Sequence, residues 1–284
     1  MIFVGSNGIV CTGTAVADTV VVTAAHCISN TGTKTIDVNG QTIELPVFTG
    51  GTVEAFKRGQ TFRISTDERV TPSAASAAQQ FKQFTIQNAV IHYSWEAQIK
   101  KAGALTVREL SLGGAADLAV LTTKESLRKA FKELRFAKID TATVHPLTTV
   151  TFVGYGCNAS GTDAQGRIVF ESSNTFTAEY GTSFVLTKDQ TTDVLSNFYQ
   201  GDLSAVASSL QKGNHLMAGS GFSLPGLCPG DSGGPVFRED SDSLIGVNSG
   251  TEYAPAANTS GSLLNRVTRL DTPEVRSFLR RQAQ

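Results

Sequence analysis

Short apolar stretches separated by turn residues recur along the chain, a pattern typical of β proteins. Val20 to Thr23 is β-branched throughout and predicts a buried strand, and Ile2 to Val10 predicts a first strand before it. Asn39-Gly40 is a typical hairpin turn. Further strands are predicted at Gly13 to Val16, Thr35 to Val38, Gln41 to Val47, Thr61 to Ile64 and Thr148 to Val153.

A few segments depart from this strand pattern. Thr122 and Glu125 form a capping box, and Leu127, Phe131 and Leu134 follow at helical spacing, which predicts a surface helix. Asp271 to Glu274 caps a predicted terminal helix whose apolar face is Val275, Phe278 and Leu279. Asp202 to Leu210 predicts a short helix within an insertion, and residues 95–114 predict a surface insertion.

Composition is that of an ordinary globular protein. The 284 residues suffice for a two-lobed protein with a sizeable core, and 40% are hydrophobic against 17% charged. The formal net charge of −1 offers no argument for nucleic acid or an anionic membrane as partner. No apolar run approaches the length of a membrane span. The 27 glycines and 8 prolines suit a turn-rich β protein.

The stretch Leu227 to Pro235, with the sequence LCPGDSGGP, carries the clearest chemistry. Ser232 is a candidate nucleophile, and its N–H and that of Gly230 are candidate donors to a developing oxyanion. Gly233 and Gly234 are expected to leave room for a substrate carbonyl. Because a serine hydroxyl is a weak nucleophile at neutral pH, this interpretation requires a histidine base and a carboxylate that orients it.

Suitable partners occur earlier in the chain. His26 follows the buried strand, and the small pair Ala24-Ala25 lets the chain turn beneath it. Asp117 opens the apolar run Leu118 to Leu121, where an aspartate is costly unless it is hydrogen-bonded. A histidine Nδ1–H is a suitable partner for such a carboxylate. His92, His145 and His215 are interpreted as structural histidines.

The segments TAAHC, DLAVL and GDSGGP, in this order, resemble the three triad segments of chymotrypsin/trypsin-like serine peptidases. The resemblance implies an all-β fold of two packed antiparallel six-stranded barrels with a C-terminal helix and an active site between them. It also places a strand at Gln87 to Tyr93. The implied domains are a first barrel (1–122), a connection with a surface helix (123–146), a second barrel (147–270) and the terminal helix (271–284).

The resemblance further implies a serine endopeptidase that works through an acyl-enzyme. His26, Asp117 and Ser232 form the expected triad, and the N–H groups of Gly230 and Ser232 the expected oxyanion hole. No metal or organic cofactor is needed. Protein or peptide substrates are the expected partners, with protein inhibitors as a second class.

The four cysteines are Cys11, Cys27, Cys157 and Cys228. No CxxC pair argues for zinc, and spacing leaves three disulfide pairings open besides four reduced thiols. The resemblance favours Cys11–Cys27, which leaves Cys157–Cys228 as the second bridge. Disulfides imply an oxidising compartment, so the expected location is secreted or periplasmic.

Substrate preference is inferred from the same resemblance. Gly226 stands where trypsin-like members carry an aspartate at the base of the specificity pocket, which predicts an uncharged residue before the cut. Ser249, Gly250 and Thr251 match the edge that pairs with the substrate backbone. Gly250 replaces an aromatic residue and predicts a more open or differently filled subsite. Glu252 and Asn265 are candidates for polarising the pocket.

The partner of Asp231 stays open. In the family a liberated α-amino group pairs with the aspartate before the nucleophile, but Ile2 to Val10 is expected to be a strand. Either a signal and activation segment precedes Met1 in the natural protein, or another donor binds Asp231.

Two other functions are compatible with these segments. One is a catalytically silent or latent homologue that serves as a binding module. The other is an esterase that uses the same triad.

Overall fold

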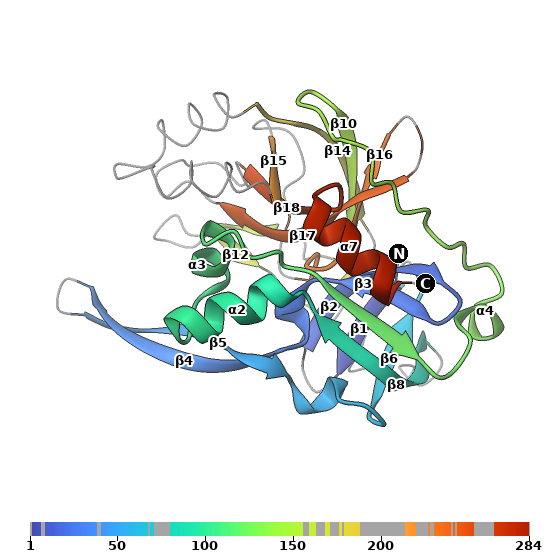
Figure 1. Ribbon diagram of the computed structural model, residues 1–284, viewed down its shortest axis with the longest axis horizontal. Coiled ribbons are helices and arrows are strands. Elements are labelled where there is room, and N and C mark those ends of the chain that lie inside the picture. The colour runs from blue at the N-terminus through green and yellow to red at the C-terminus, as the bar shows by residue number, and fades with distance from the viewer. Residues whose placement is uncertain are drawn as a thin grey trace.

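The protein is mainly β, with two barrels and a helix at the C-terminus (Figure 1). The computed structural model describes residues 2–6, 9–38, 41–67, 69–70, 80–155, 159–162, 168–170, 176–177, 179–187, 214–219, 227, 230–239, 241, 243–252 and 264–283. The predicted turn at Asn39-Gly40 and the predicted helix at residues 202–210 lie outside these residues.

The first barrel closes in the antiparallel order β1-β2-β3-β9-β8-β6, with β6 returning to β1. Its strands are β1 (Ile2–Ser6), β2 (Ile9–Ala17), β3 (Val20–Thr23), β6 (Thr61–Ser65), β8 (Lys82–Ile91) and β9 (Ala119–Thr123). The predicted single strand at residues 2–10 is instead β1 and the start of β2, which pair with each other from Ile2↔Gly13 to Ser6↔Ile9.

The second barrel closes in the antiparallel order β10-β14-β15-β18-β17-β16. Its strands are β10 (Thr149–Gly154), β14 (Glu179–Val185), β15 (His215–Gly219), β16 (Pro235–Arg238), β17 (Ser243–Glu252) and β18 (Leu264–Arg269). The predicted all-β fold of two six-stranded barrels is confirmed. The domain boundaries between them stay a prediction.

Smaller two-stranded sheets lie outside the barrels. β4 (Ser29–Val38) and β5 (Gln41–Thr52) form a long hairpin that extends away from the first barrel (Figure 1). The other pairs are β7 (Arg69–Val70) with β13 (Phe176–Thr177) and β11 (Ala159–Thr162) with β12 (Ile168–Phe170).

Residues 95–114, predicted as a surface insertion, contribute side chains to the buried core. They fold mostly into α2 (Tyr93–Ala102) and α3 (Val107–Leu112), and the side chains of Trp95 and Leu110 are fully buried. His92 caps α2 by accepting the Ser94 N–H at Nδ1. Burial lowers the pKa of His92 to about 4, so the ring is neutral near pH 7 and serves packing.

The predicted capping box at Thr122 is wrong. Thr122 lies in β9, and the short helix α4 (Leu127–Ala130) is capped by Ser126 instead. Glu125 accepts the backbone N–H of Thr85 at 2.7 Å and its hydroxyl at 2.8 Å, so this carboxylate holds β8.

The terminal helix α7 (Pro273–Gln282) forms as the sequence predicts. Thr272 caps it by accepting the Val275 N–H, and Pro273 stands in the first turn, where a missing N–H costs nothing. Its buried face of Val275, Phe278 and Leu279 joins the core of the first barrel. The described residues of the second barrel form a separate apolar cluster that includes Val150, Ile245 and Val267.

Candidate active site

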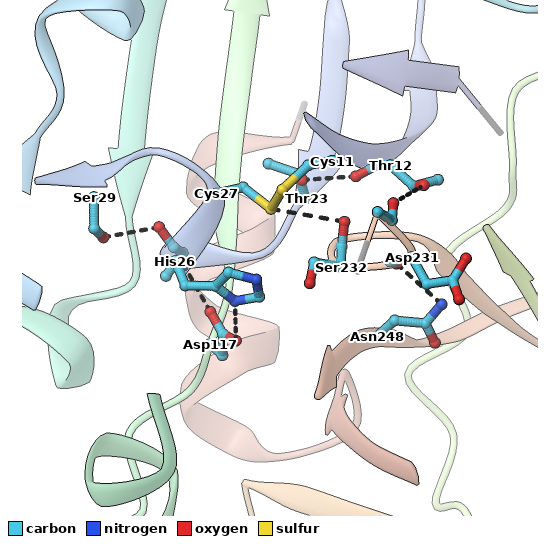
Figure 2. The surroundings of a disulfide bond; sticks show 12 residues. Cys11, Thr12, Thr23, His26, Cys27, Ser29, Asp117, Asp231, Ser232 and Asn248 are labelled. Atoms are coloured by element: carbon cyan, nitrogen blue, oxygen red, sulfur yellow. Dashed lines mark hydrogen bonds and ion pairs between the residues drawn. A yellow bond between two sulfur atoms is a disulfide. The ribbon is translucent and has the colours of Figure 1, made fainter. Parts of the chain in front are cut away.

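A disulfide lies at the centre of the candidate site (Figure 2). Cys11 on β2 is bonded to Cys27 in the 3₁₀ turn η1 (Ala25–Cys27), which confirms the first predicted pairing. The Cys27 sulfur lies 3.6 Å from the Ser232 carbonyl oxygen, and this is a packing contact because the bonded sulfur carries no proton. The predicted partners Cys157 and Cys228 lie outside the described residues.

His26 and Asp117 are directly hydrogen-bonded. The His26 Nδ1 lies 2.7 Å from the Asp117 Oδ2, and the His26 backbone N–H donates to Oδ1 at 2.9 Å. Because a carboxylate only accepts, Nδ1 carries a proton, which leaves Nε2 of the neutral ring as a proton acceptor. The ring lies between Asp117 and Ser232 (Figure 2), with Nε2 directed away from Asp117.

Asp117 is fully buried and ionised. Burial by itself raises the pKa of Asp117, but the electrostatic interaction with the His26 ring and the hydrogen bonds from His26 and Ser249 outweigh it and hold this pKa below its usual value. The Ser249 hydroxyl donates to Oδ2 at 2.7 Å. A buried carboxylate with these donors is a fixed negative charge beside the imidazole.

A β-bulge explains why Ser249 reaches Asp117. The register of β17 against β18 runs Asn248↔Val267 and then Gly250↔Arg266, so Ser249 is the extra residue. A bulge changes the direction of one side chain, and here the Ser249 hydroxyl donates to the carboxylate. The Thr268 hydroxyl on β18 also donates to the Asp117 carbonyl, at 3.2 Å. The second barrel therefore holds the Asp117 of the first.

His215 on β15 holds the loop before Asp117. Its Nε2 donates to the Ala115 carbonyl at 2.9 Å, and neighbouring Asn214 donates to the Gly114 carbonyl. Burial, together with the positive charge of Arg266, lowers the pKa of His215 to about 4. The ring is thus neutral at pH 7 and acts as a fixed donor.

This lowered pKa predicts acid destabilisation. In the unfolded chain His215 titrates at about pH 6.5. Between pH 6.5 and about pH 4, therefore, only the unfolded state takes up a proton at this residue. The free energy of unfolding should fall by about 1.4 kcal/mol per pH unit over this window on account of His215. We expect His215→Gln to keep a donor and remove this share of the slope, as measured by urea unfolding at several pH values.

Exposed His145 supplies the matched control, because His145→Gln should leave the slope unchanged. An unchanged slope in the His215 variant would contradict a buried neutral histidine at this position.

The loop that contains Ser232 is held from both barrels. The Thr12 N–H donates to the Ser232 carbonyl at 2.8 Å from the first barrel. From the second, Asn248 accepts the Gly233 N–H at 2.8 Å through its carbonyl and donates to the Gly234 carbonyl at 2.9 Å. Thr12 of the first barrel thus holds Ser232 of the second, just as Ser249 and Thr268 of the second hold Asp117 of the first.

The glycines beside Ser232 permit close packing of backbone on backbone. A Cβ on Gly233, whose φ is +82°, would lie 2.3 Å from the Thr12 carbonyl oxygen. A Cβ on Gly234 would lie 2.3 Å from the Val153 carbonyl oxygen. Contacts within the protein therefore require glycine at both positions, and the room for a substrate carbonyl stays a prediction. The φ of +106° at Gly230 also favours glycine.

The structure describes three of the four predicted substrate-binding residues. Gly226 lies outside the described residues, and Gly250 and Thr251 lie on β17 beyond the bulge. A Cβ on Gly250 would lie 2.7 Å from the Arg266 Nη2, so a buried guanidinium fills the place beside this glycine. The Arg266 side chain therefore occupies the space beside Gly250, and the consequence for a substrate subsite stays a prediction.

Asn265 precedes Arg266 on β18. Its side-chain oxygen accepts the Leu227 N–H at 3.0 Å, next to the predicted pocket residue Gly226.

The carboxylate of Asp231 lies against Gly154, where a Cβ would come within 2.0 Å of Oδ1. Ile2 lies in β1 of the first barrel.

Metal binding finds little support among the described residues. There, the only cluster with metal-ligand chemistry is Cys11, His26 and Cys27, whose ligand atoms lie within 4.8 Å of one another. Both sulfurs are committed to the disulfide, and Nδ1 of His26 to Asp117. None of the described helices is long and apolar enough to span a membrane.

Two closed six-stranded antiparallel barrels with a C-terminal helix define the chymotrypsin-like class of proteins. The Trypsin family model matches residues 66–272, well over half of the chain, and the chain therefore belongs to the trypsin family of serine peptidases. The match contains Asp117 and Ser232 and begins after His26. No curated protein matches the chain.

Sequence reasoning missed Thr12, Asn248 and Thr268 as residues that support the site, and it named His215 as a structural histidine without its bond to the Ala115 carbonyl. Thr12 is the one with a local signal, because it follows a cysteine that the resemblance placed in the disulfide. Ser249 was singled out, but for substrate binding and not for its bond to Asp117.

Proposed function

We propose that this chain is a serine endopeptidase whose catalytic residues are His26, Asp117 and Ser232. The observation that carries the proposal is the 2.7 Å bond between His26 Nδ1 and a fully buried Asp117, with Ser232 on the other side of the ring (Figure 2). The pair leaves Nε2 as the base, and a base beside a serine hydroxyl is what nucleophilic catalysis requires.

The mechanism follows from these roles. During attack on the scissile carbonyl, the Ser232 Oγ–C bond forms while Nε2 of His26 takes the hydroxyl proton. Asp117 holds the tautomer and stabilises the imidazolium that results. His26 then gives the proton to the leaving amine as the C–N bond breaks, which leaves the acyl-enzyme. In the second half, His26 takes a proton from the attacking water and gives it to the Ser232 Oγ as the bond between Oγ and the acyl carbon breaks.

The proposed oxyanion hole consists of the N–H groups of Gly230 and Ser232. Both residues lie in the loop that Thr12 and Asn248 hold between the barrels. Donors fixed before the reaction stabilise the tetrahedral intermediate without reorganisation, typically by about 3–4 kcal/mol for each donor.

We propose a preference for an uncharged residue before the cut. Gly226 carries no acid, and the side chain that bonds the adjacent residue Leu227 is the neutral amide of Asn265. A pocket of this kind offers no partner for arginine or lysine. A peptide library with Ser232→Ala as the blank should show cuts after apolar or small residues. Efficient cleavage after arginine, with none after Phe, Leu, Ala or Val, would contradict this preference while leaving the peptidase assignment intact.

The Cys11–Cys27 disulfide supports an oxidising compartment, and we propose a secreted or periplasmic location on that ground.

A further inference from the structure

Thr12 occupies a buried position between the two barrels. It follows Cys11 on β2, and its side chain is fully buried. Its hydroxyl donates to the Gly230 carbonyl at 2.7 Å, across 218 residues of sequence, and accepts the Tyr155 N–H at 3.0 Å. Its own carbonyl accepts the Thr23 hydroxyl at 2.9 Å, which fixes Thr12 to the strand that leads to His26.

The direction of these hydrogen bonds is determined by their partners. The Tyr155 N–H can only donate, so it uses a lone pair of the hydroxyl. The Gly230 carbonyl can only accept, so the single hydroxyl proton goes to it. The hydroxyl is therefore oriented, and no water is needed to complete its hydrogen bonding.

Thr12 thus binds both residues of the proposed oxyanion hole. Its hydroxyl holds the Gly230 carbonyl, and its backbone N–H holds the Ser232 carbonyl at 2.8 Å. We propose that Thr12 is a positioning residue for catalysis, whose hydroxyl sets the orientation of the Gly230 N–H as an oxyanion donor. The inference rests on the proposed serine-peptidase function and deepens it.

Glycine needs such a restraint more than any other residue. Gly230 has a φ of +106°, and a glycine backbone has many other conformations of similar energy. The N–H and carbonyl of one residue are separated by only two rotatable bonds, so fixing the carbonyl restricts the direction of the N–H. Without the hydroxyl, the buried Gly230 carbonyl lacks its hydrogen-bond donor and is stabilised by rotating toward water. The Gly230 N–H then no longer points at the developing oxyanion.

The same strand offers a matched control. Thr14 lies two residues further along β2 and has a relative exposure of 1%, but its hydroxyl has no hydrogen-bond partner among the described residues. Thr14→Val removes the same atom from an equally buried site and should leave turnover unchanged. Thr12→Ser keeps the hydroxyl, whereas Thr12→Val and the smaller Thr12→Ala remove it.

The test measures kcat and KM for a peptide amide, with kcat normalised to the sites that a fluorophosphonate labels. Normalisation removes any unfolded fraction from the comparison. We expect Thr12→Val to lower kcat by about 10- to 100-fold, less than the about 10²- to 10³-fold typical when an oxyanion donor is lost outright. KM should change little, since the lost interaction acts in the transition state.

Affinity for a peptide aldehyde, whose adduct carries an oxyanion, should fall in parallel with kcat, and Thr12→Ser should restore both. Thr12→Ala gives the same comparison if the valine variant does not fold.

Two outcomes overturn different claims. A wild-type chain that neither labels nor cleaves contradicts the proposed function. An active wild type, with Thr12→Val or Thr12→Ala equal to Thr14→Val in kcat and aldehyde affinity, contradicts the role of Thr12 and leaves the peptidase assignment in place.

Discussion

Replacing Ser232 by alanine is expected to lower kcat for a peptide amide by about 10⁶-fold, the scale found when a triad nucleophile is removed. The change deletes one oxygen from a half-buried side chain. The backbone bonds that hold the loop, from Thr12 to the Ser232 carbonyl and between Asn248 and the glycines, do not involve that oxygen. Turnover should therefore vanish while the thermal unfolding midpoint stays close to that of the wild type.

The matched control for this variant is Ser241→Ala, which removes the hydroxyl of an exposed serine nine residues further on. It should leave both turnover and the unfolding midpoint unchanged. Peptidase activity that persists in purified Ser232→Ala would refute Ser232 as the nucleophile.

Replacing Asp117 by asparagine is expected to lower kcat by about 10⁴-fold at neutral pH. The carboxylate accepts the His26 N–H, the His26 Nδ1–H and the Ser249 hydroxyl. An amide offers one oxygen and a donor NH₂ group, so it cannot accept at both positions. An NH₂ group facing Nδ1 favours the tautomer with the proton on Nε2, and the base toward Ser232 is lost.

Asp140→Asn provides the comparison for this change, since Asp140 is a partly buried aspartate paired with Arg238 at 3.2 Å, away from His26. It should retain kcat, and unfolding curves of both variants would separate chemical from structural effects. A kcat for Asp117→Asn within about tenfold of the wild type would show that the carboxylate does not set the tautomer.

Local pattern was sufficient for much of the fold. β3 forms at the predicted residues because Val20 to Thr23 combines β-branching with burial, and α7 forms because its cap and apolar face agree. The capping box at Thr122 failed for a tertiary reason. Pairing with β3 and β8 extends β9 through Thr123, and Glu125 bonds to Thr85 instead of to a helix N-terminus.

In the candidate site, too, local sequence indicates some residues, and only the fold brings the others into contact. His26, Asp117 and Ser232 could be named as candidates from the sequence because each lies in a short segment whose composition suits its proposed role. The residues that hold them could not. Ser249 reaches Asp117 only because of a bulge, and the partners of Thr12 lie 143 and 218 residues away. Such contacts depend on how two barrels meet, and no local pattern encodes that.

Intact-mass labelling with a fluorophosphonate tests the central claim most directly, because the reagent reacts with a serine only where a base and an oxyanion hole are assembled. The account predicts one label for each wild-type chain, and none for Ser232→Ala or His26→Ala. A folded wild-type chain that takes up no label would contradict the proposed peptidase and favour a latent or silent homologue that acts as a binding module.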